Sequence, residues 1–336
     1  MSAGNETGHA RALAALGSPA TRALLALAAV VVLGIIFHAD GAFYAWHTHR
    51  DMLRQVSVYG ILACGMTLVI ITGGIDLAVG SVLGLVAVLF SILTIHWGWS
   101  AWLAVPLCLL AGAGCGAASG TMIARYRLQP FIVTLAMMVF ARGLAKYISG
   151  GRKISTYIQH PDGSFENVPM PAVFSAIDTR VFGGNVAVVT LIFLVCVAAA
   201  WFLLDRTRAG RYLYALGGNE TAAHLSGLSV VRLKLLAYGA SGFFAAIAGM
   251  CQAAQETQGD PEAGATYELT AIAIVVIGGT NLMGGRGSVL LTLLGALTIG
   301  YLEKILSLNA VGEASRLMLT GGIIVAAVLM QGRRRT

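Results

Sequence analysis

The sequence predicts an all-α polytopic membrane protein with about ten transmembrane helices, and three observations support this fold class. Of the 336 residues, 57% are hydrophobic and only 11% are charged, whereas soluble domains carry about 25% charged residues. The apolar residues form continuous runs, not the alternating pattern of a membrane β-barrel. Ten helices of about 20 residues each leave room only for short loops. A soluble globular protein, a disordered chain and a membrane enzyme with a large soluble domain are therefore excluded.

Ten apolar runs define the candidate helices along the chain. They cover 23–37, 56–71, 77–95, 101–123, 131–148, 186–204, 233–254, 268–279, 289–307 and 316–330. The run 268–279 is too short to cross a bilayer unless residues 263–267 extend it, so a broken or re-entrant helix is the alternative there. The first run is short enough for a cleaved signal peptide, but no clear small-x-small cleavage site ends it, which favours a helix.

The chain divides into one membrane domain and two tails. Residues 1–22 are an N-terminal tail, residues 23–331 the transmembrane domain, and residues 332–336 a basic C-terminal tail. With the N-terminus placed inside, the inner segments hold most of the Lys and Arg residues, as the positive-inside rule requires. Arg152 and Lys153, in an outer loop, run against the rule. We therefore expect both termini in the cytoplasm.

The inner loop at about 205–232 predicts a compact helical element on the cytoplasmic face. A first short helix is expected to stop at Gly217-Gly218, because glycine is common at helix C-termini. Asn219 is then placed to cap a second short helix that starts at Glu220. Gly227 is expected to end that helix.

Two similar segments occur in the two halves of the chain, at residues 70–82 and 276–289. Each segment begins with an apolar run, continues with the motif Gly-Gly-x-[Asp/Asn]-Leu and then Gly-Ser-Val, and ends in a further apolar run. Gly-Gly breaks a helix, and Asp76 or Asn281 is expected to cap the next one by accepting from its first amides. The candidate residues are Thr72, Gly73, Gly74, Asp76, Gly278, Gly279, Asn281, Gly284 and Gly285.

Two interpretations of these breaks stay open. A tight cytoplasmic turn with a good cap is favoured by the ten-helix count, which puts both breaks near the cytoplasmic side. The alternative is a broken helix that lines a transport pathway, since Gly-interrupted segments in corresponding positions of two halves point to such a pathway. Irregular backbone at membrane depth needs protein or water around it.

The chain lacks the patterns of catalysis, nucleotide binding and metal binding. No Gly-x4-Gly-Lys-[Ser/Thr] occurs, so no P-loop cradles ATP. The five cysteines form no CxxC pair, and no carboxylate or cysteine completes a metal set with His47 and His49. No Ser/His/Asp arrangement, catalytic carboxylate pair or basic run interleaved with aromatics stands out. We expect a non-catalytic protein with no bound cofactor, no metal and no nucleic-acid partner.

Four ordered segments resemble the ribose-type permease subunits of bacterial ATP-binding-cassette (ABC) importers, members of the family of binding-protein-dependent transport system inner membrane components. The segments are GMTLVIITGGIDLAVGSVLGL (Gly65–Leu85), PFIVTLAMMVFARGLA (Pro130–Ala145), AGRYLYALGGNETAAHLSGLSVVRLKLLAYGASGFFAAIAGM (Ala209–Met250) and the stretch Gly278–Val289 with the helix after it. The resemblance runs from about residue 50 to 330. It is specific for the family and much less specific for the sugar.

The resemblance implies the ABC importer permease fold, a place in the bacterial inner membrane, and three kinds of partner. Two permeases, a homodimer or a close heterodimer, form the pore. An ATPase subunit, which binds ATP–Mg, docks on the cytoplasmic side, and a periplasmic or lipid-anchored binding protein delivers a monosaccharide.

The segment that inserts into the ATPase corresponds to Asn219–Gly227, where Glu220, Ala222, Ala223 and Gly227 are similar to a loose EAA…G loop. Thr221 departs from that pattern. The candidate coupling residues are Arg211, Gly218, Asn219, Glu220, Ala222, Ala223 and Gly227.

Two alternative functions stay open on the sequence. One is an ABC permease for another solute, such as a branched-chain amino acid or a nucleoside. The other is a secondary transporter driven by H⁺ or Na⁺, for which Asp76 is the candidate membrane-embedded acid.

Overall fold

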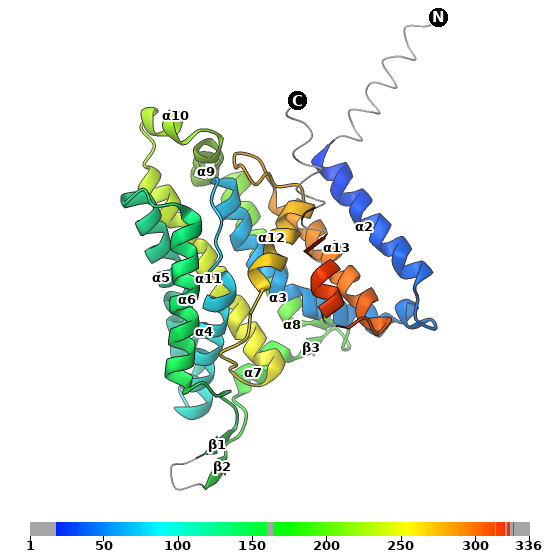
Figure 1. The fold of residues 1–336 in the computed structure, drawn as a ribbon. Coiled ribbons are helices and arrows are strands. Elements are labelled where there is room, and N and C mark those ends of the chain that lie inside the picture. Colours follow the sequence, from blue (N-terminus) through cyan, green and yellow to red (C-terminus); the bar gives the residue numbers. More distant parts are fainter. Residues whose placement is uncertain (1–17, 160–163, 313, 320, 323–324, 326–336) are drawn as a thin grey trace, which may run out of the picture.

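The computed structural model describes residues 18–159, 164–312, 314–319, 321–322 and 325 (Figure 1). Its helices are α2 (Pro19–Ile36), α3 (Trp46–Ile71), α4 (Val79–Ser91), α5 (Ala101–Arg125), α6 (Pro130–Ser149), α7 (Ala172–Asp178), α8 (Val188–Trp201), α9 (Arg208–Gly218), α10 (Glu220–Leu225), α11 (Val230–Glu256), α12 (Tyr267–Ile277) and α13 (Val289–Leu308). Short helical turns are η1 (Ala42–Tyr44), η2 (Ile92–His96) and η3 (Phe202–Arg206). Two small hairpins pair β1 (Tyr157–Gln159) with β2 (Phe165–Asn167) and β3 (Arg180–Val181) with β4 (Val186–Ala187).

Eight of the described helical segments are long and apolar enough to cross a membrane, which confirms the all-α polytopic prediction. They are 19–36, 46–71, 79–96, 101–125, 130–149, 188–206, 230–256 and 289–308. Helix α12 has only 11 residues, as its short apolar run predicts. The tenth run, 316–330, and the tail 332–336 lie largely or wholly outside the described residues.

Two helix starts differ from the prediction. Helix α2 begins inside the predicted tail 1–22, because Pro19 stands at its first position and the Ser18 hydroxyl accepts from the Thr21 amide at 3.1 Å. Helix α3 begins at Trp46, ten residues before its apolar run. The extra turns carry polar residues that are paired across the chain: Arg180 binds Asp51 at 2.5 Å, and Arg54 binds Asp178.

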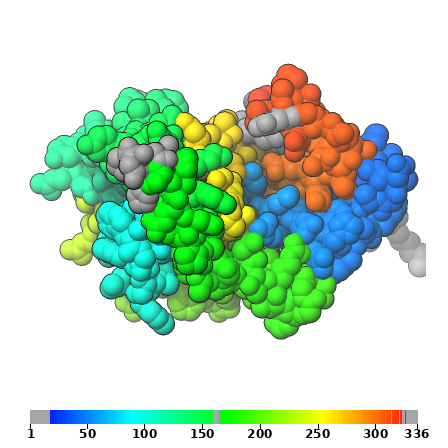
Figure 2. Space-filling model, turned by 90° about the horizontal axis from the view of Figure 1, so that it is seen from below, coloured from blue at the N-terminus to red at the C-terminus, as the bar shows by residue number. Residues whose placement is uncertain are grey.

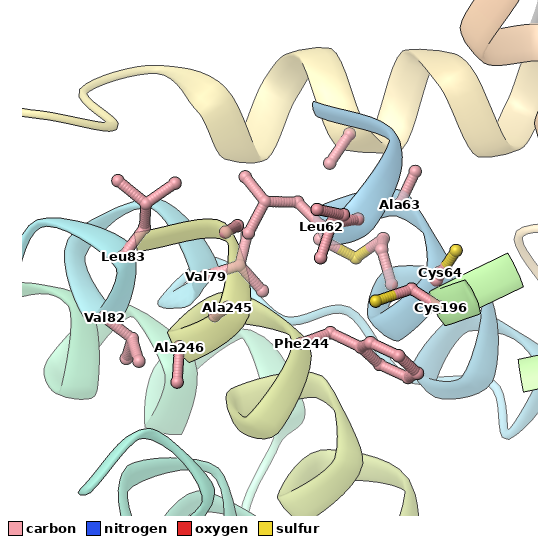
Figure 3. Packing of buried hydrophobic residues seen from close by; sticks show 14 of the residues in the cluster. Leu62, Ala63, Cys64, Val79, Val82, Leu83, Cys196, Phe244, Ala245 and Ala246 are labelled. Carbon is pink, nitrogen blue, oxygen red and sulfur yellow. The ribbon is translucent and has the colours of Figure 1, made fainter. Parts of the chain in front are cut away.

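The core is built around α11, which packs on α5, α3 and α4. Figure 3 shows the meeting of α3, α4, α8 and α11, where Ala245 and Ala246 of α11 face Val79, Val82 and Leu83 of α4. Small residues allow this close approach. Where α5 crosses α11, a Cβ atom on Gly112 would lie 2.5 Å from the Gly242 carbonyl oxygen. The outer helices α2, α5 and α6 expose most of their apolar side chains, as lipid-facing helices do.

The bundle has two distinct ends. Helices α9 and α10 lie together at one end, and the β1–β2 hairpin lies at the other (Figure 1). Figure 2 shows the molecule from the hairpin end. The segment around the end of α11, in yellow, lies in the middle of this view. The cyan and green helices lie on one side of it, and the blue and orange helices lie on the other. The cytoplasmic loop and the outer loops of the prediction therefore lie at opposite ends.

Helices α4 and α12 both start inside the bundle. Asp76, just before α4, bonds to Ser241, near the middle of α11. The segment after α11 returns into the fold, where Gly264 lies backbone to backbone against Gly80 in the first turn of α4. Helix α12 begins three residues later, at Tyr267. These two short helices therefore have their N-termini at a similar depth.

Candidate functional site

The helical element predicted at about 205–232 contains two short helices joined at one residue, Asn219. The Asn219 amide donates to the Ala215 carbonyl at the end of α9 (3.1 Å). Its side-chain oxygen accepts from the Ala222 amide at the start of α10 (2.9 Å). Asn219 therefore ends one helix and caps the next, as the sequence predicts.

The end of α10 is a glycine C-cap of the Schellman type. Gly227 has φ +83°, its amide donates to the His224 carbonyl (2.9 Å), and the Leu228 amide donates to the Ala223 carbonyl (3.1 Å). Both bonds satisfy carbonyls at a helix end. Glu220, at the start of α10, accepts from Lys234 of α11 at 2.8 and 2.9 Å. The predicted start and stop of α10 are confirmed, and the ion pair ties the element to a long helix.

The outward face of this element offers a mixed apolar and basic surface. Leu225 is 81% exposed, and Arg211 and Ala222 are also exposed. Leu213, Leu216 and Ala223 are buried beneath them. Leu225, Ala222 and Arg211 are therefore accessible from outside the bundle.

The end of α9 touches both sequence breaks through glycine backbones. A Cβ atom on Gly217 would overlap the Ile71 carbonyl oxygen at the end of α3 and lie 2.7 Å from the Gly285 nitrogen. A Cβ atom on Gly284 would lie 2.8 Å from both the Gly217 oxygen and the Gly73 nitrogen. We name Gly73, Gly217, Gly284 and Gly285 the glycine junction.

Hydrogen bonds join the same three segments. The Gly285 amide donates to the Ile71 carbonyl (2.9 Å), and the Tyr214 hydroxyl of α9 donates to the Gly287 carbonyl (3.0 Å). Gly73, Gly284 and Gly285 have φ values of +79°, +85° and +72°, a region that L side chains rarely adopt. The junction therefore needs glycine both for its conformation and for its close contacts.

The first break, residues 72–78, is a buried irregular segment. The Thr72 hydroxyl donates to the Val69 carbonyl (2.7 Å), which covers the end of α3. Gly74 lies against the ring of Tyr238 on α11. Asp76, 3% exposed, accepts from the Ala78 amide (3.0 Å) and from the Ser241 hydroxyl (2.7 Å). The first break therefore fits the broken helix better than the tight cytoplasmic turn, because its backbone continues into the bundle.

The expectation that Asp76 caps α4 needs correction. The N-cap residue of α4 is Ala78, and no side chain bonds to the helix there. Asp76 instead turns the backbone before the helix and holds it against α11. The partner that decides this role, Ser241, is 165 residues away in sequence, so no local pattern indicates it.

The second break, residues 278–288, is a turn between two packed helices, α12 and α13. The Asn281 side-chain oxygen accepts from the Met283 backbone amide (3.1 Å), and the Asn281 backbone amide donates to the Arg286 carbonyl (2.9 Å). Asn281 thus closes the turn and does not cap α13, which starts at Val289 behind Ser288. The cap prediction is wrong here too, because the two extra residues before Gly-Ser-Val move the helix away from Asn281.

Gly278 and Gly279, the remaining candidate residues of the second break, lie apart from the glycine junction. A Cβ atom on Gly278 would lie 2.6 Å from the Leu291 oxygen of α13, and one on Gly279 (φ +87°) would lie 3.0 Å from Pro19 of α2. The structure thus brings Gly73, Gly284 and Gly285 to α9, and leaves Gly278 and Gly279 as packing and turn residues. The sequence does not predict the contact of Gly217 with the other two segments, because the pair Gly217-Gly218 indicates only the end of a helix.

The described residues contain no group of three or more His, Cys, Asp or Glu side chains that could hold a metal ion. The site is therefore built of backbone contacts, caps and packed small residues. Such an arrangement can pass motion between helices.

Comparison with known proteins adds the family. The family described as "Branched-chain amino acid transport system / permease component" matches residues 49–328. The ribose import permease protein RbsC of Escherichia coli strain K12 is 39% identical over 310 residues, covering 92% of this chain and 93% of the relative.

Two further relatives are named after other sugars. The fructose import permease protein FrcC of Rhizobium meliloti is 35% identical over 312 residues, covering 93% of this chain and 84% of the relative. The xylose transport system permease protein XylH of Escherichia coli strain K12 is 32% identical over 353 residues, covering 90% of each. No solved structure matches the chain.

Proposed function

The chain belongs to the branched-chain amino acid transport system permease family, and we propose that it is the membrane-spanning permease subunit of an ABC importer for a monosaccharide. The named relatives that support this proposal import ribose, fructose and xylose. The eight apolar helical segments fit a multi-pass protein of the bacterial inner membrane. The subunit itself is non-catalytic.

The contact between Gly217 and both helix breaks is the observation that carries the mechanism. A separate ATPase subunit binds ATP–Mg and holds the exposed face of α9 and α10. When two ATPases close, they move α9 as a rigid unit. Because the glycine junction leaves no space between α9, the end of α3 and the α12–α13 turn, both breaks move with it.

The remaining partners follow from the same arrangement. Two permease subunits, either two copies of this chain or one copy and a sister permease, enclose the pathway. A periplasmic or lipid-anchored binding protein delivers the sugar at the end that carries the β1–β2 hairpin. The α9–α10 end faces the cytoplasm, as do both termini.

The proposal is tested by reconstitution of the chain in lipid with its ATPase and binding-protein partners. We expect ATP hydrolysis to rise when the binding protein carries its sugar, and sugar to accumulate inside. The variant Gly227→Arg is expected to insert at a normal level but to lose the coupling of hydrolysis to uptake. Failure to form a complex with any ATPase, or normal uptake by Gly227→Arg, contradicts the proposal.

A second candidate cargo rests on one specific finding. The family description names branched-chain amino acids, while the named relatives import sugars. Parallel uptake assays with labelled pentoses, hexoses and leucine separate the two, and we expect accumulation of a sugar only. Uptake that persists without ATP and collapses with an ionophore identifies an ion-coupled transporter instead.

A further inference from the structure

A cavity of about 430 Å³ opens between α6, the start of α4 and the segment that leads into α12. Its polar and charged lining consists of Ser81, Arg142, Lys146, Thr266 and Glu268, and Met138 and Val139 form an apolar wall. This volume is in the range of small-molecule pockets, about 300–1,000 Å³.

The cavity exists because two short helices begin beside it. Backbone contact between Gly80 and Gly264 fixes the start of α4 against the segment that enters α12. Gly264 has φ +75°, so a side chain at this position is disfavoured by conformation as well as by space. The cavity wall opposite α6 is therefore fixed by the backbone contact between Gly80 and Gly264.

Glu268 and Arg142 place opposite charges on this cavity. A Cβ atom on Gly80 would lie 2.6 Å from a Glu268 carboxylate oxygen, so the carboxylate lies against the first turn of α4. Arg142, on α6, donates through Nη1 to the Pro261 carbonyl and to the Ala263 carbonyl (2.8 Å). These bonds hold the guanidinium in place beside the cavity.

Arg142 and Glu268 do not form a direct ion pair. Both residues are described, and the ion pairs of the described residues do not join Arg142 to Glu268. Lys146, one turn further along α6, instead pairs with Glu262 at 2.5 Å. Half-buried charges within a membrane bundle are costly, so a solute that offers a donor to Glu268 and an acceptor to Arg142 is favoured between them.

We propose that this cavity is a binding station for the sugar on its way through the permease, an inference that rests on the proposed function. One sugar hydroxyl donates to the Glu268 carboxylate while a neighbouring hydroxyl accepts from the Arg142 guanidinium. The C–H face of the ring packs on Met138 and Val139.

The first test compares charge-removing variants in the reconstituted complex. Glu268→Gln and Arg142→Gln each weaken a charge-assisted hydrogen bond, so we expect about ten- to hundredfold less sugar transported per ATP hydrolysed. ATP hydrolysis and its stimulation by loaded binding protein are expected to persist. Asp260→Asn is the matched control, because Asp260 lies in the same segment and pairs with Lys153, and neither of these two residues lines the cavity.

The second test blocks the cavity sterically. Gly143 lines the cavity, and a Cβ atom there meets nothing within 4 Å, so Gly143→Cys fits without disturbance. We expect a sugar-sized thiol reagent to stop uptake by this variant, and transported sugar to slow the labelling. Gly114→Cys, on α5, has equal free space but lies outside the cavity, so labelling there is expected to leave uptake unchanged.

The outcomes separate this inference from the function on which it rests. Absence of sugar uptake by the unmodified complex overturns the proposed function. Normal uptake by the unmodified complex, together with unchanged transport per ATP in Glu268→Gln and Arg142→Gln, overturns the binding station alone. Labelling of Gly143→Cys that neither blocks uptake nor responds to sugar overturns it as well.

Discussion

The two glycine breaks share a motif but adopt different structures. The first, residues 72–78, carries the chain from the end of α3 into the middle of the bundle, where Asp76 is buried against Ser241. The second, residues 278–288, is a turn between α12 and α13, which pack on each other. Gly217 of α9 contacts Ile71, directly before the first break, and Gly285 of the second. The comparison shows that the motif provides a flexible backbone, while the surrounding helices decide whether it becomes a buried segment or a turn.

This difference suggests separate roles for the two breaks. The buried break fixes the start of α4, beside the proposed sugar cavity, so it sets the geometry of the pathway. The turn transmits the position of α9 to α12 and α13. Substitutions that remove a buried hydrogen-bonding group, a close glycine contact or an exposed hydrogen bond can therefore test whether the two breaks differ in this way.

The largest effect on stability is expected for Asp76→Ala in the first break. The substitution leaves the buried Ser241 hydroxyl and the Ala78 amide without their acceptor, and buried groups that lose a charged partner cost about 3 kcal/mol. Thermal unfolding in detergent measures this loss. Asp76→Asn keeps an acceptor oxygen and is expected to lose less than half as much; equal losses for the two variants contradict the hydrogen-bonding role.

An intermediate effect is expected for Gly284→Ala in the second break. Its φ of +85° adds about 1–2 kcal/mol of strain for a non-glycine residue, and its Cβ atom would also press on Gly217 and Gly73. Gly73→Ala has a similar φ of +79°, but its nearest neighbour is 3.7 Å away. Midpoints of thermal unfolding should therefore fall further for Gly284→Ala than for Gly73→Ala. The opposite order shows that the junction is not closely packed at Gly284.

The smallest effect is expected for Asn281→Ala. The side chain is only partly buried, and its best bond is to the Met283 amide at 3.1 Å, so its removal costs about 1 kcal/mol. Comparison with Asp76→Ala in one unfolding series tests the contrast between the breaks directly. A loss for Asn281→Ala as large as that for Asp76→Ala would show that the second break is buried like the first.

The sequence predicts the local features of this fold well. Helices α5 and α6 match their apolar runs within two residues at each end, because continuous apolar runs are themselves the signal of a spanning helix. The caps at Asn219 and Gly227 are also predicted, since each depends on residues within one turn. Local patterns carry this information completely.

Long-range contacts explain what the sequence does not predict. The polar first turns of α3 are helical because Asp51 and Arg54 pair with residues more than 120 positions away. The role of Gly217 depends on Ile71 and Gly285, which lie in other segments of the chain. Such contacts follow from the packing of whole helices and leave no trace in spacing or composition.

The central claim is that Gly217 couples α9 to both breaks, and a glycine of α5 provides the control. Gly217→Ala would overlap the Ile71 carbonyl, whereas Gly114→Ala, outside the coupling element, meets nothing within 4 Å. The measurement is sugar uptake and ATP hydrolysis by both variants, reconstituted side by side with their partners at equal protein levels. We predict that Gly217→Ala hydrolyses ATP but transports at least about tenfold less sugar, and that Gly114→Ala resembles the unmodified protein. Equal uptake by the two variants contradicts the claim.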